Sequence, residues 1–116
     1  MEATEDTGQI GYDEFSKINL RVGQIHQAER VEKSEKLIKL SVDVGEPEQR
    51  QIIAGIGKRY APEELIGRKV AVVTNLKPAK LMGQMSNGML LAGSDTAGNL
   101  ELIEINPILP PGSVIK

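Results

Sequence analysis

The sequence predicts an all-β fold, a small five-stranded barrel with Greek-key connections. Segments of alternating apolar and polar residues recur along the chain, and the clearest runs from Lys36 to Gly45, where Ile38, Leu40, Val42 and Val44 share one face. Turns rich in glycine and proline separate these segments, and helical patterns are limited to single turns. A length of 116 residues suits one domain. An all-β sandwich is the competing fold.

The N-terminal part divides into a polar leader and the start of the domain. Residues 1–12 are mostly polar and acidic, and we expect a disordered leader or linker there, followed by a domain over residues 13–116. Asp13 is expected to cap one helical turn. Phe15 and Ile18 are three residues apart, so both are expected to dock on one side of the sheet.

Three strands are expected in the first half. They cover residues 20–31, 36–45 and 50–54. Gly23 indicates a bulge or a sharp bend in the first of them, as in small closed barrels. His26 is the only histidine and has no partner pattern for metal or nucleophilic chemistry, so we expect a surface position.

The second half supplies a helical turn, the remaining strands and a C-terminal extension. In residues 61–67, Pro62 stands at the first helical position, and Glu63 and Glu64 follow where the helix dipole favours acids. These acids are thus explained without catalysis. Further strands are expected over residues 68–74, 89–92, 100–105 and 114–115. This order matches a barrel of the OB type. Its apolar C-terminal surplus predicts a homodimer.

The segment from Asn75 to Gly88 is expected to be a shaped loop between two strands. Pro78 cannot donate to a sheet ladder, so the chain must leave the sheet there. The loop should carry Lys77 and Lys80 outward, as a binding surface on a rigid scaffold. The three methionines of this region are expected in the core or in dimer packing; they are Met82, Met85 and Met89.

The charge is unevenly distributed. The net charge is −2, but residues 1–14 contain five acids and no base. Residues 58–92 contain six bases against two acids. A basic middle in an acidic chain favours a polyanionic partner, although ordinary scatter of a solvated surface is an equal alternative on charge alone.

Several classes of function are disfavoured by what the sequence lacks. It contains no cysteine, which excludes disulfides and thiolate metal sites and suits a reducing, cytoplasmic setting. No run approaches the roughly 18 apolar residues of a membrane span, so no membrane partner is expected. Only three aromatic residues argue against base-by-base stacking on rings. No phosphate loop, metal-ligand cluster or nucleophile–base pair is visible, so we expect no enzyme activity, cofactor or metal.

Five blocks of sequence point to a known family. They are Phe15–Gly23, Glu35–Leu37, Ala54–Ile56, Pro62–Leu65 and Asn75–Met89. Over residues 13–116 the chain resembles the bacterial tRNA-binding domain, found as free-standing dimers and as the C-terminal appendage of methionyl-tRNA synthetase. This resemblance implies a dimeric OB fold without catalysis that binds the outer corner of tRNA by shape, alone or helping a synthetase catalytic domain to capture tRNA. A peptide-binding, export-related chaperone of the same family is the alternative.

The resemblance also implies an RNA-binding face. Its residues here are Lys36, Asn75, Lys77, Lys80 and Ser86; the charge distribution adds Lys58 and Arg59. Structural alternatives stay open for most of them. Asn75 could equally be a turn residue, and Ser86 could bond only the neighbouring loop. Ordinary solvated charge is the alternative for Lys58, Arg59, Lys77 and Lys80. The chain departs from the family pattern at Asn19, Ala54 and Ala79, where aspartate, serine and arginine are usual. The missing arginine implies one phosphate contact fewer.

Overall fold

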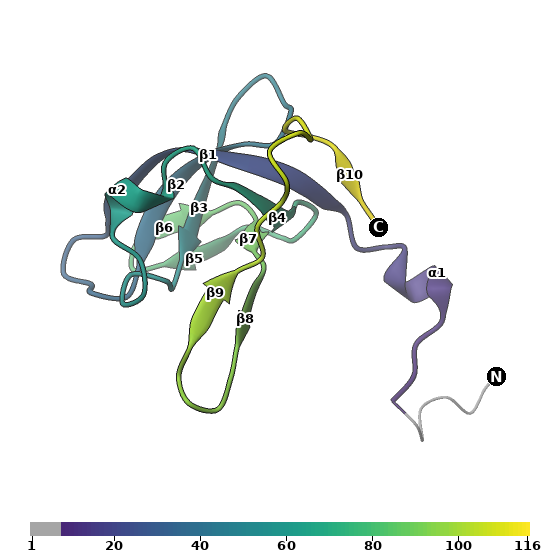
Figure 1. The fold of residues 1–116 in the computed structure, drawn as a ribbon, viewed down its shortest axis with the longest axis horizontal. Helices are drawn as coiled ribbons and strands as arrows, with labels where there is room; N and C mark the ends of the chain where they lie inside the picture. The colour runs from purple at the N-terminus through teal and green to yellow at the C-terminus, as the bar shows by residue number, and fades with distance from the viewer. Residues whose placement is uncertain (1–7) are drawn as a thin grey trace.

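The computed structural model describes residues 8–116, and its centre is one antiparallel sheet coiled nearly into a barrel (Figure 1). The strand order is β3-β2-β1-β4-β7, and β10 pairs with β1. The strands of this sheet are β1 (Leu20–Arg30), β2 (Ile38–Asp43), β3 (Arg50–Ala54), β4 (Lys69–Val73), β7 (Met89–Leu90) and β10 (Val114–Ile115). The predicted all-β, OB-like barrel is confirmed.

Strand β1 is the longest, and both of its edges are paired, one with β4 and the other with β2 and β10. Its pairing with β2 shifts register between Ile25 and Gln27, which bends the strand and leaves His26 on the surface as expected. Of the bulge or sharp bend predicted at Gly23, the bulge is not at that residue: the register with β4 is regular there, and the irregularity follows later in the strand. A Cβ atom at Gly23 would lie 2.6 Å from Val72 Cγ2 and 2.8 Å from Val42 Cγ1. Glycine is therefore needed because side chains of two other strands press against the backbone.

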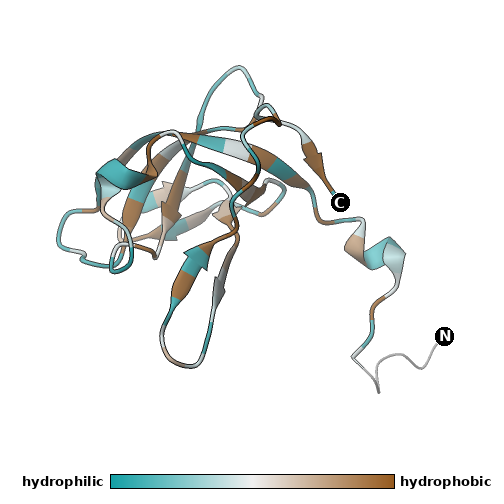
Figure 2. Cartoon of the chain, viewed as in Figure 1, coloured by the Kyte–Doolittle hydropathy of each residue, from teal (hydrophilic) through white to brown (hydrophobic). Residues whose placement is uncertain are grey.

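The core is aliphatic, and Figure 2 shows its brown segments along the barrel strands. Strand β2 alternates buried and half-buried residues from Ile38 to Asp43, as its sequence pattern predicted. Tyr60 is the largest fully buried side chain in the described part of the chain. The barrel is therefore filled by branched side chains that keep few rotamers, which favours a stiff frame.

The two helices within residues 8–116 have four residues each. Helix α2 (Pro62–Leu65) begins with proline as predicted and buries Leu65. Helix α1 (Tyr12–Phe15) starts after Gly11, whose amide nitrogen donates to the Glu14 carboxylate at 3.3 Å. The predicted Asp13 cap is therefore wrong. Across residues 8–116, neither helix has the length and apolar character needed to cross a membrane.

Helix α1 lies away from the barrel, at the opposite end of the molecule from α2 (Figure 1). It buries no residue, and both Phe15 and Ile18 are exposed. The prediction that these two side chains dock on the sheet is therefore wrong for the isolated chain. The expected leader over residues 1–12 falls mainly on residues 1–7, which lie outside the described residues, so the division at residue 13 stays a prediction.

In the part of the chain that the structure describes, two hairpins extend from the main sheet. The first, β5 (Ala79–Leu81) with β6 (Gln84–Ser86), occupies the segment predicted to be a loop. The second pairs β8 (Ala92–Ser94) with β9 (Leu100–Leu102) and projects from the barrel (Figure 1). Ala92 thus belongs to β8 and does not continue β7 as expected. Only residues 100–102 of the strand predicted over 100–105 are in that pairing.

Candidate nucleic-acid interface

The β5–β6 hairpin is held against strand β3 by hydrogen bonds. The Ser86 hydroxyl accepts from the Ile53 amide at 2.9 Å and donates to the Gly88 carbonyl at 3.1 Å. The Gln51 side chain donates to the Met85 carbonyl at 2.9 Å. Ser86 is only 5% exposed. Its hydroxyl therefore fixes the hairpin to the barrel edge, and both its donor and an acceptor position are used within the protein.

Arg50 fastens the two ends of the same segment. Its Nη1 donates to the Thr74 carbonyl at 2.7 Å and to the Asn87 carbonyl at 3.3 Å. Its other nitrogens bind the Glu46 carboxylate, and this hydrogen bond lowers the pKa of Glu46 below its ordinary value. The sequence reasoning missed Arg50, because an arginine that opens a strand gives no sign of which carbonyls it will meet.

Asn75 is also engaged by the backbone. Its Oδ1 accepts from the Asn19 amide at 2.8 Å, and its Nδ2 donates to the Lys17 carbonyl at 2.6 Å. These bonds tie the segment between α1 and β1 to the end of β4. The Asn75 side chain therefore hydrogen-bonds the backbone of a segment far away in the sequence, and not the backbone of its own turn as the alternative supposed.

Lys77 and Lys80 are both exposed on this segment, and neither side chain has a hydrogen bond or ion pair with residues 8–116. Lys80 lies directly opposite Met85 in the hairpin register, so the two side chains share one face. Ser86 faces β3 on the other side, which directs Lys80 and Met85 to solvent. No acidic residue occurs between Glu64 and Asp95 in the sequence.

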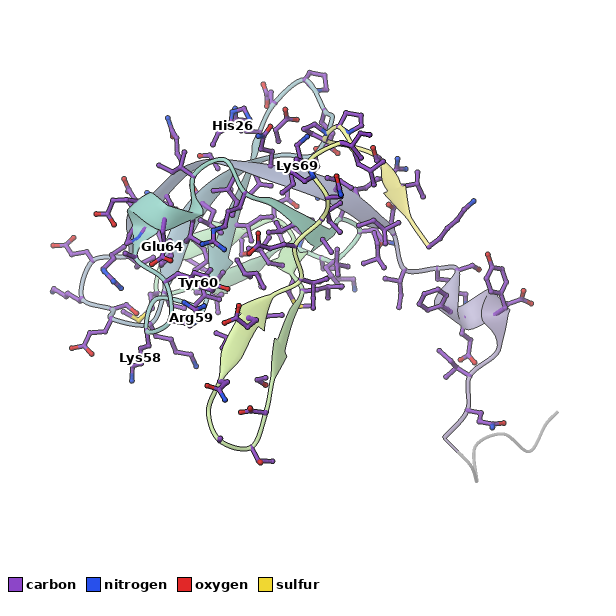
Figure 3. The ribbon with its side chains drawn as sticks, viewed as in Figure 1. His26, Lys58, Arg59, Tyr60, Glu64 and Lys69 are labelled. Carbon is purple, nitrogen blue, oxygen red and sulfur yellow. The ribbon has the colours of Figure 1, made fainter. Side chains whose placement is uncertain are left out.

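Lys36 and Lys58 lie on two adjoining loops at the other end of β3. The Gly57 amide donates to the Lys36 carbonyl at 2.7 Å, and Arg30 Nη1 bridges the Glu35 and Gly57 carbonyls at 3.1 and 2.9 Å. Both lysines are exposed and have no carboxylate partner among residues 8–116. Figure 3 shows Lys58 pointing away from the ribbon.

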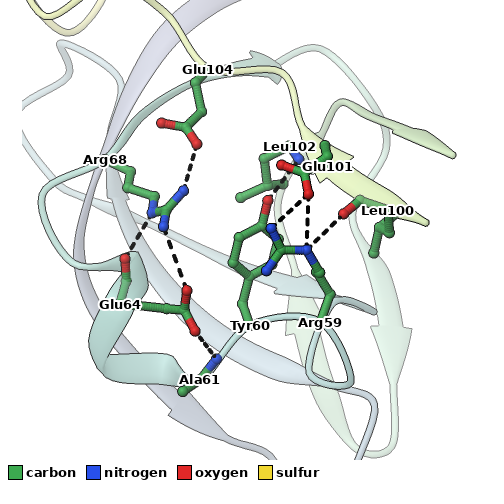
Figure 4. A network of polar contacts seen from close by, with 9 residues as sticks. All are labelled: Arg59, Tyr60, Ala61, Glu64, Arg68, Leu100, Glu101, Leu102 and Glu104. Carbon is green, nitrogen blue, oxygen red and sulfur yellow. Dashed lines mark hydrogen bonds and ion pairs between the residues drawn. The ribbon is translucent and has the colours of Figure 1, made fainter.

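Arg59, the neighbour of Lys58, is bound within the protein (Figure 4). Its Nη2 donates to Glu101 at 2.6 Å, its Nε donates to the Leu100 carbonyl at 3.1 Å, and its guanidinium lies 4.4 Å from the centre of the Tyr60 ring. The hydrogen bond to Glu101 raises the pKa of Arg59 above its ordinary value. Arg59 therefore connects the segment that precedes α2 to the β8–β9 hairpin.

Tyr60 is the centre of that connection. It is 1% exposed, and its hydroxyl accepts from the Leu102 amide at 3.0 Å. A second guanidinium, that of Arg68, lies 5.2 Å from the ring and is paired with Glu64 and Glu104 (Figure 4). Two cations on one ring, one paired with a single carboxylate and the other with two, hold β9 against the barrel.

The predicted RNA-binding residues thus divide into two groups. The four lysines are exposed cations on segments that adjoin β3. Arg59, Asn75 and Ser86 hydrogen-bond within the protein and hold those segments in place. Within residues 8–116, no group of three histidine, aspartate or glutamate side chains is arranged to hold a metal ion.

Two roles were expected for the methionines, core packing and dimer packing. Met82, Met85 and Met89 are exposed, so core packing is wrong, and dimer packing stays a prediction. The turn Met82–Gly83 joins two strands of three residues each, and both of its residues have positive φ. Met-Gly is not one of the residue pairs that usually form such a turn, so no local signal in the sequence announces this hairpin.

A second exposed surface, at the other end of the molecule, is apolar. We call it the terminal face; its exposed apolar residues are Tyr12, Phe15, Ile18 and Val114. A shallow depression joins α1 to β10 there, and Phe15 and Val114 both line it. Strand β10 pairs only with β1 in the described residues, so its other edge is open.

Comparisons with known proteins agree on one family. The sequence model of the tRNA binding domain matches residues 20–114. Methionine–tRNA ligase of Listeria innocua is 50% identical over 116 residues, which are all of this chain and 17% of the ligase. The ligase of Methanococcoides burtonii is 53% identical over 106 residues, 91% of this chain and 16% of that protein. This chain therefore spans about one sixth of the length of these relatives.

Two solved structures have the same fold over most of their length. The MetRS-related protein of Pyrococcus horikoshii has a TM-score of 0.88 and 40% identity, covering 93% of this chain and 98% of that one. The chaperone CsaA of Bacillus anthracis has a TM-score of 0.83 and 34% identity, covering 93% of this chain and 99% of the other.

Proposed function

Because the chain belongs to the tRNA-binding domain family, we propose that it is a non-catalytic module that binds tRNA by shape at the outer corner of the folded molecule. One observation supports this most strongly. Lys36, Lys58, Lys77 and Lys80 are exposed along segments adjoining β3, and none has a carboxylate partner among residues 8–116.

The lysines suit recognition of a phosphate backbone. Each ammonium group is a mobile point charge that can meet phosphate from several directions. Ser86 and Arg50 fix the segment that presents Lys77 and Lys80, and Arg30 joins the loops that present Lys36 and Lys58. The spacing of the charges is therefore set by the barrel. Phosphate and 2′-hydroxyl contacts give shape recognition, which needs no aromatic stacking platform.

Binding of unfractionated tRNA to Lys77→Ala/Lys80→Ala tests this proposal. We expect roughly a tenfold loss of affinity at low salt. The log–log salt slope should become shallower by about 1.4 to 1.8, because each lost phosphate contact contributes about 0.7 to 0.9. Lys36→Ala/Lys58→Ala should behave similarly.

The matched control is Lys39→Ala/Lys69→Ala, which removes the same charge from two lysines already bound within the protein. Lys39 pairs with Glu29 at 3.2 Å, and Lys69 donates to the Pro107 and Leu109 carbonyls. This control should lose much less affinity. Failure of the unmodified protein to bind tRNA at low salt would refute the proposal.

We further propose that the module acts as a homodimer through the terminal face. Pairing would cover apolar side chains that this chain leaves exposed, and it would double the lysines that meet one RNA. The proposal covers two arrangements, a free-standing dimer and an appendage of methionyl-tRNA synthetase in the cytoplasm. In the appendage, this module would hold tRNA while a separate catalytic domain performs aminoacylation.

A second candidate function is polypeptide binding by a chaperone related to CsaA. The exposed apolar residues of the β5–β6 hairpin favour it, since Leu81, Met82 and Met85 could meet an unfolded chain. Competition decides between the two functions. If an unfolded polypeptide displaces tRNA at similar concentration, chaperone activity is supported; if it leaves tRNA binding unchanged, the tRNA module is supported.

A further inference from the structure

The tip of the β5–β6 hairpin holds a methionine in an unfavourable backbone conformation. Met82 has φ of 49° and Gly83 has φ of 78°, as in a two-residue type I′ turn. Asparagine, aspartate or glycine is favoured at the first of these positions, because side chains without a local hydrogen bond are strained there. The turn requires the left-handed conformation but not a methionine in it. A strained methionine at this position therefore indicates a role for its side chain.

That side chain makes no contribution to the core. Met82 is 58% exposed, and Met85, on the outward face beside Lys80, is 49% exposed. The hairpin therefore presents two soft thioether groups and one unpaired ammonium group to solvent, on a support fixed to β3 by Ser86.

A nucleotide offers matching chemistry: a phosphate next to a flat, polarizable ring. We propose that Met82 and Met85 pack against an unstacked nucleobase at the outer corner of the RNA while Lys80 binds an adjoining phosphate. This inference rests on the proposed tRNA function and names how the same site recognises RNA. Thioether groups make favourable contacts with aromatic rings, and here they would replace the aromatic residues that such surfaces usually carry.

The surrounding charge favours RNA over a polypeptide as the occupant. Lys77 and Lys80 flank the methionines, and the sequence contains no acid from residue 65 to residue 94. The positive potential of these lysines attracts a polyanion such as RNA. An average apolar polypeptide segment gains nothing from the unpaired cations.

The test is Met82→Asn, measured with unfractionated tRNA. Asparagine suits the left-handed position, so this variant should melt at the same temperature as the unmodified protein or higher. We expect about a fivefold loss of tRNA affinity, at the low end of what base contacts contribute. The salt slope should not change, because no phosphate contact is removed.

Two controls separate the apolar contact from charge. Met82→Leu keeps an apolar side chain at the same strained position and should stay within about twofold of the unmodified protein. Lys80→Ala should reduce the salt slope by about 0.7 to 0.9 with the methionines intact. On a long, fully paired RNA duplex, which has few accessible base faces, Met82→Asn should bind as well as the unmodified protein.

Equal tRNA affinity of Met82→Asn and the unmodified protein would overturn the inference, as would an equal loss on the paired duplex. A loss confined to unfolded polypeptide would assign the hairpin tip to protein binding and overturn it too. The proposed function has its own failure, namely no binding of tRNA by the unmodified protein. Binding that depends on Lys80 but not on Met82 refutes only the nucleobase contact.

Discussion

At the scale of single residues, the structure separates side chains that the sequence grouped together. Lys77 and Ser86 both occur in the segment after β4, yet one is exposed and the other is buried against Ile53. Family resemblance and charge could identify the lysines, because long charged side chains stay at the surface. They could not place Ser86 or Asn75, because a short polar side chain serves either a ligand or a neighbouring backbone.

Ser86→Ala should reduce stability rather than remove an RNA contact. Alanine leaves the Ile53 amide without its acceptor at a buried site, which costs about 1 to 3 kcal/mol. Urea unfolding measures this loss. The folded variant should lose affinity for tRNA only because its hairpin is held less firmly, and not because a contact with RNA is missing.

Ser94→Ala is the control for this substitution, since Ser94 is an exposed serine in β8. It should change stability by no more than about 0.5 kcal/mol. Full stability in Ser86→Ala, together with lost tRNA affinity, would instead place the Ser86 hydroxyl in direct contact with RNA.

At the scale of elements, long strands were predictable and short hairpins were not. Strand β2 has a regular alternation that fixes which face is buried. The β5–β6 hairpin has three residues per strand, follows Pro78 and turns at Met82–Gly83, so neither period nor usual turn residues announce it. Its position is set by bonds from Arg50 and Ser86, which are tertiary contacts beyond any local pattern.

The β8–β9 hairpin depends on one carboxylate at its turn. Asp95 Oδ1 accepts from the Ala97 and Asn99 amides at 2.9 Å, and Oδ2 accepts from the Asn99 side chain at 2.7 Å. The side-chain bond from Asn99 is the main reason that the pKa of Asp95 lies below its usual 3.8. A lowered folded-state pKa means that the stabilisation is complete above the ordinary value and is lost as the pH falls through the lowered one.

Acid should therefore loosen this turn before it unfolds the barrel. Below pH 3.8 we expect faster hydrogen exchange at the Ala97 and Asn99 amides, relative to the intrinsic rates at each pH. Asp95→Asn has no titrating group at this position and should lose this local pH dependence. An unchanged pH profile in that variant would show that another acid controls the turn.

At the scale of the whole molecule, helix α1 differs from the barrel in having no buried side chain. The barrel buries its own apolar residues, whereas α1 buries none. The periodicity of a single sequence cannot distinguish a residue that packs on its own sheet from one that packs on a second copy. This explains why the sequence identified Phe15 and Ile18 as apolar contacts but could not tell that they do not dock on their own sheet.

Phe15→Ser/Val114→Ser should convert the proposed dimer to a monomer without disturbing the fold. Both side chains lie on the exposed terminal face, so the barrel loses little when they change. Light scattering gives the mass, and far-ultraviolet circular dichroism checks the strands. The monomer should also bind tRNA more weakly, because it has lost the second set of lysines.

Ile66→Ser is the matched control, since Ile66 is an exposed isoleucine next to α2, at the far end of the molecule. This variant should keep the mass of the unmodified protein. A monomeric unmodified protein, or a double variant that remains dimeric, would contradict the assignment of the interface.

The position of β10 has a consequence for solubility. One edge of β1 pairs with β2 from Gln24 onward, and β10 covers the same edge at Leu20 and Arg21. The two-residue strand β10 thus pairs with the backbone groups of β1 that β2 does not reach. Loss of β10 would present a bare strand edge beside an apolar surface, the combination that drives disordered aggregation.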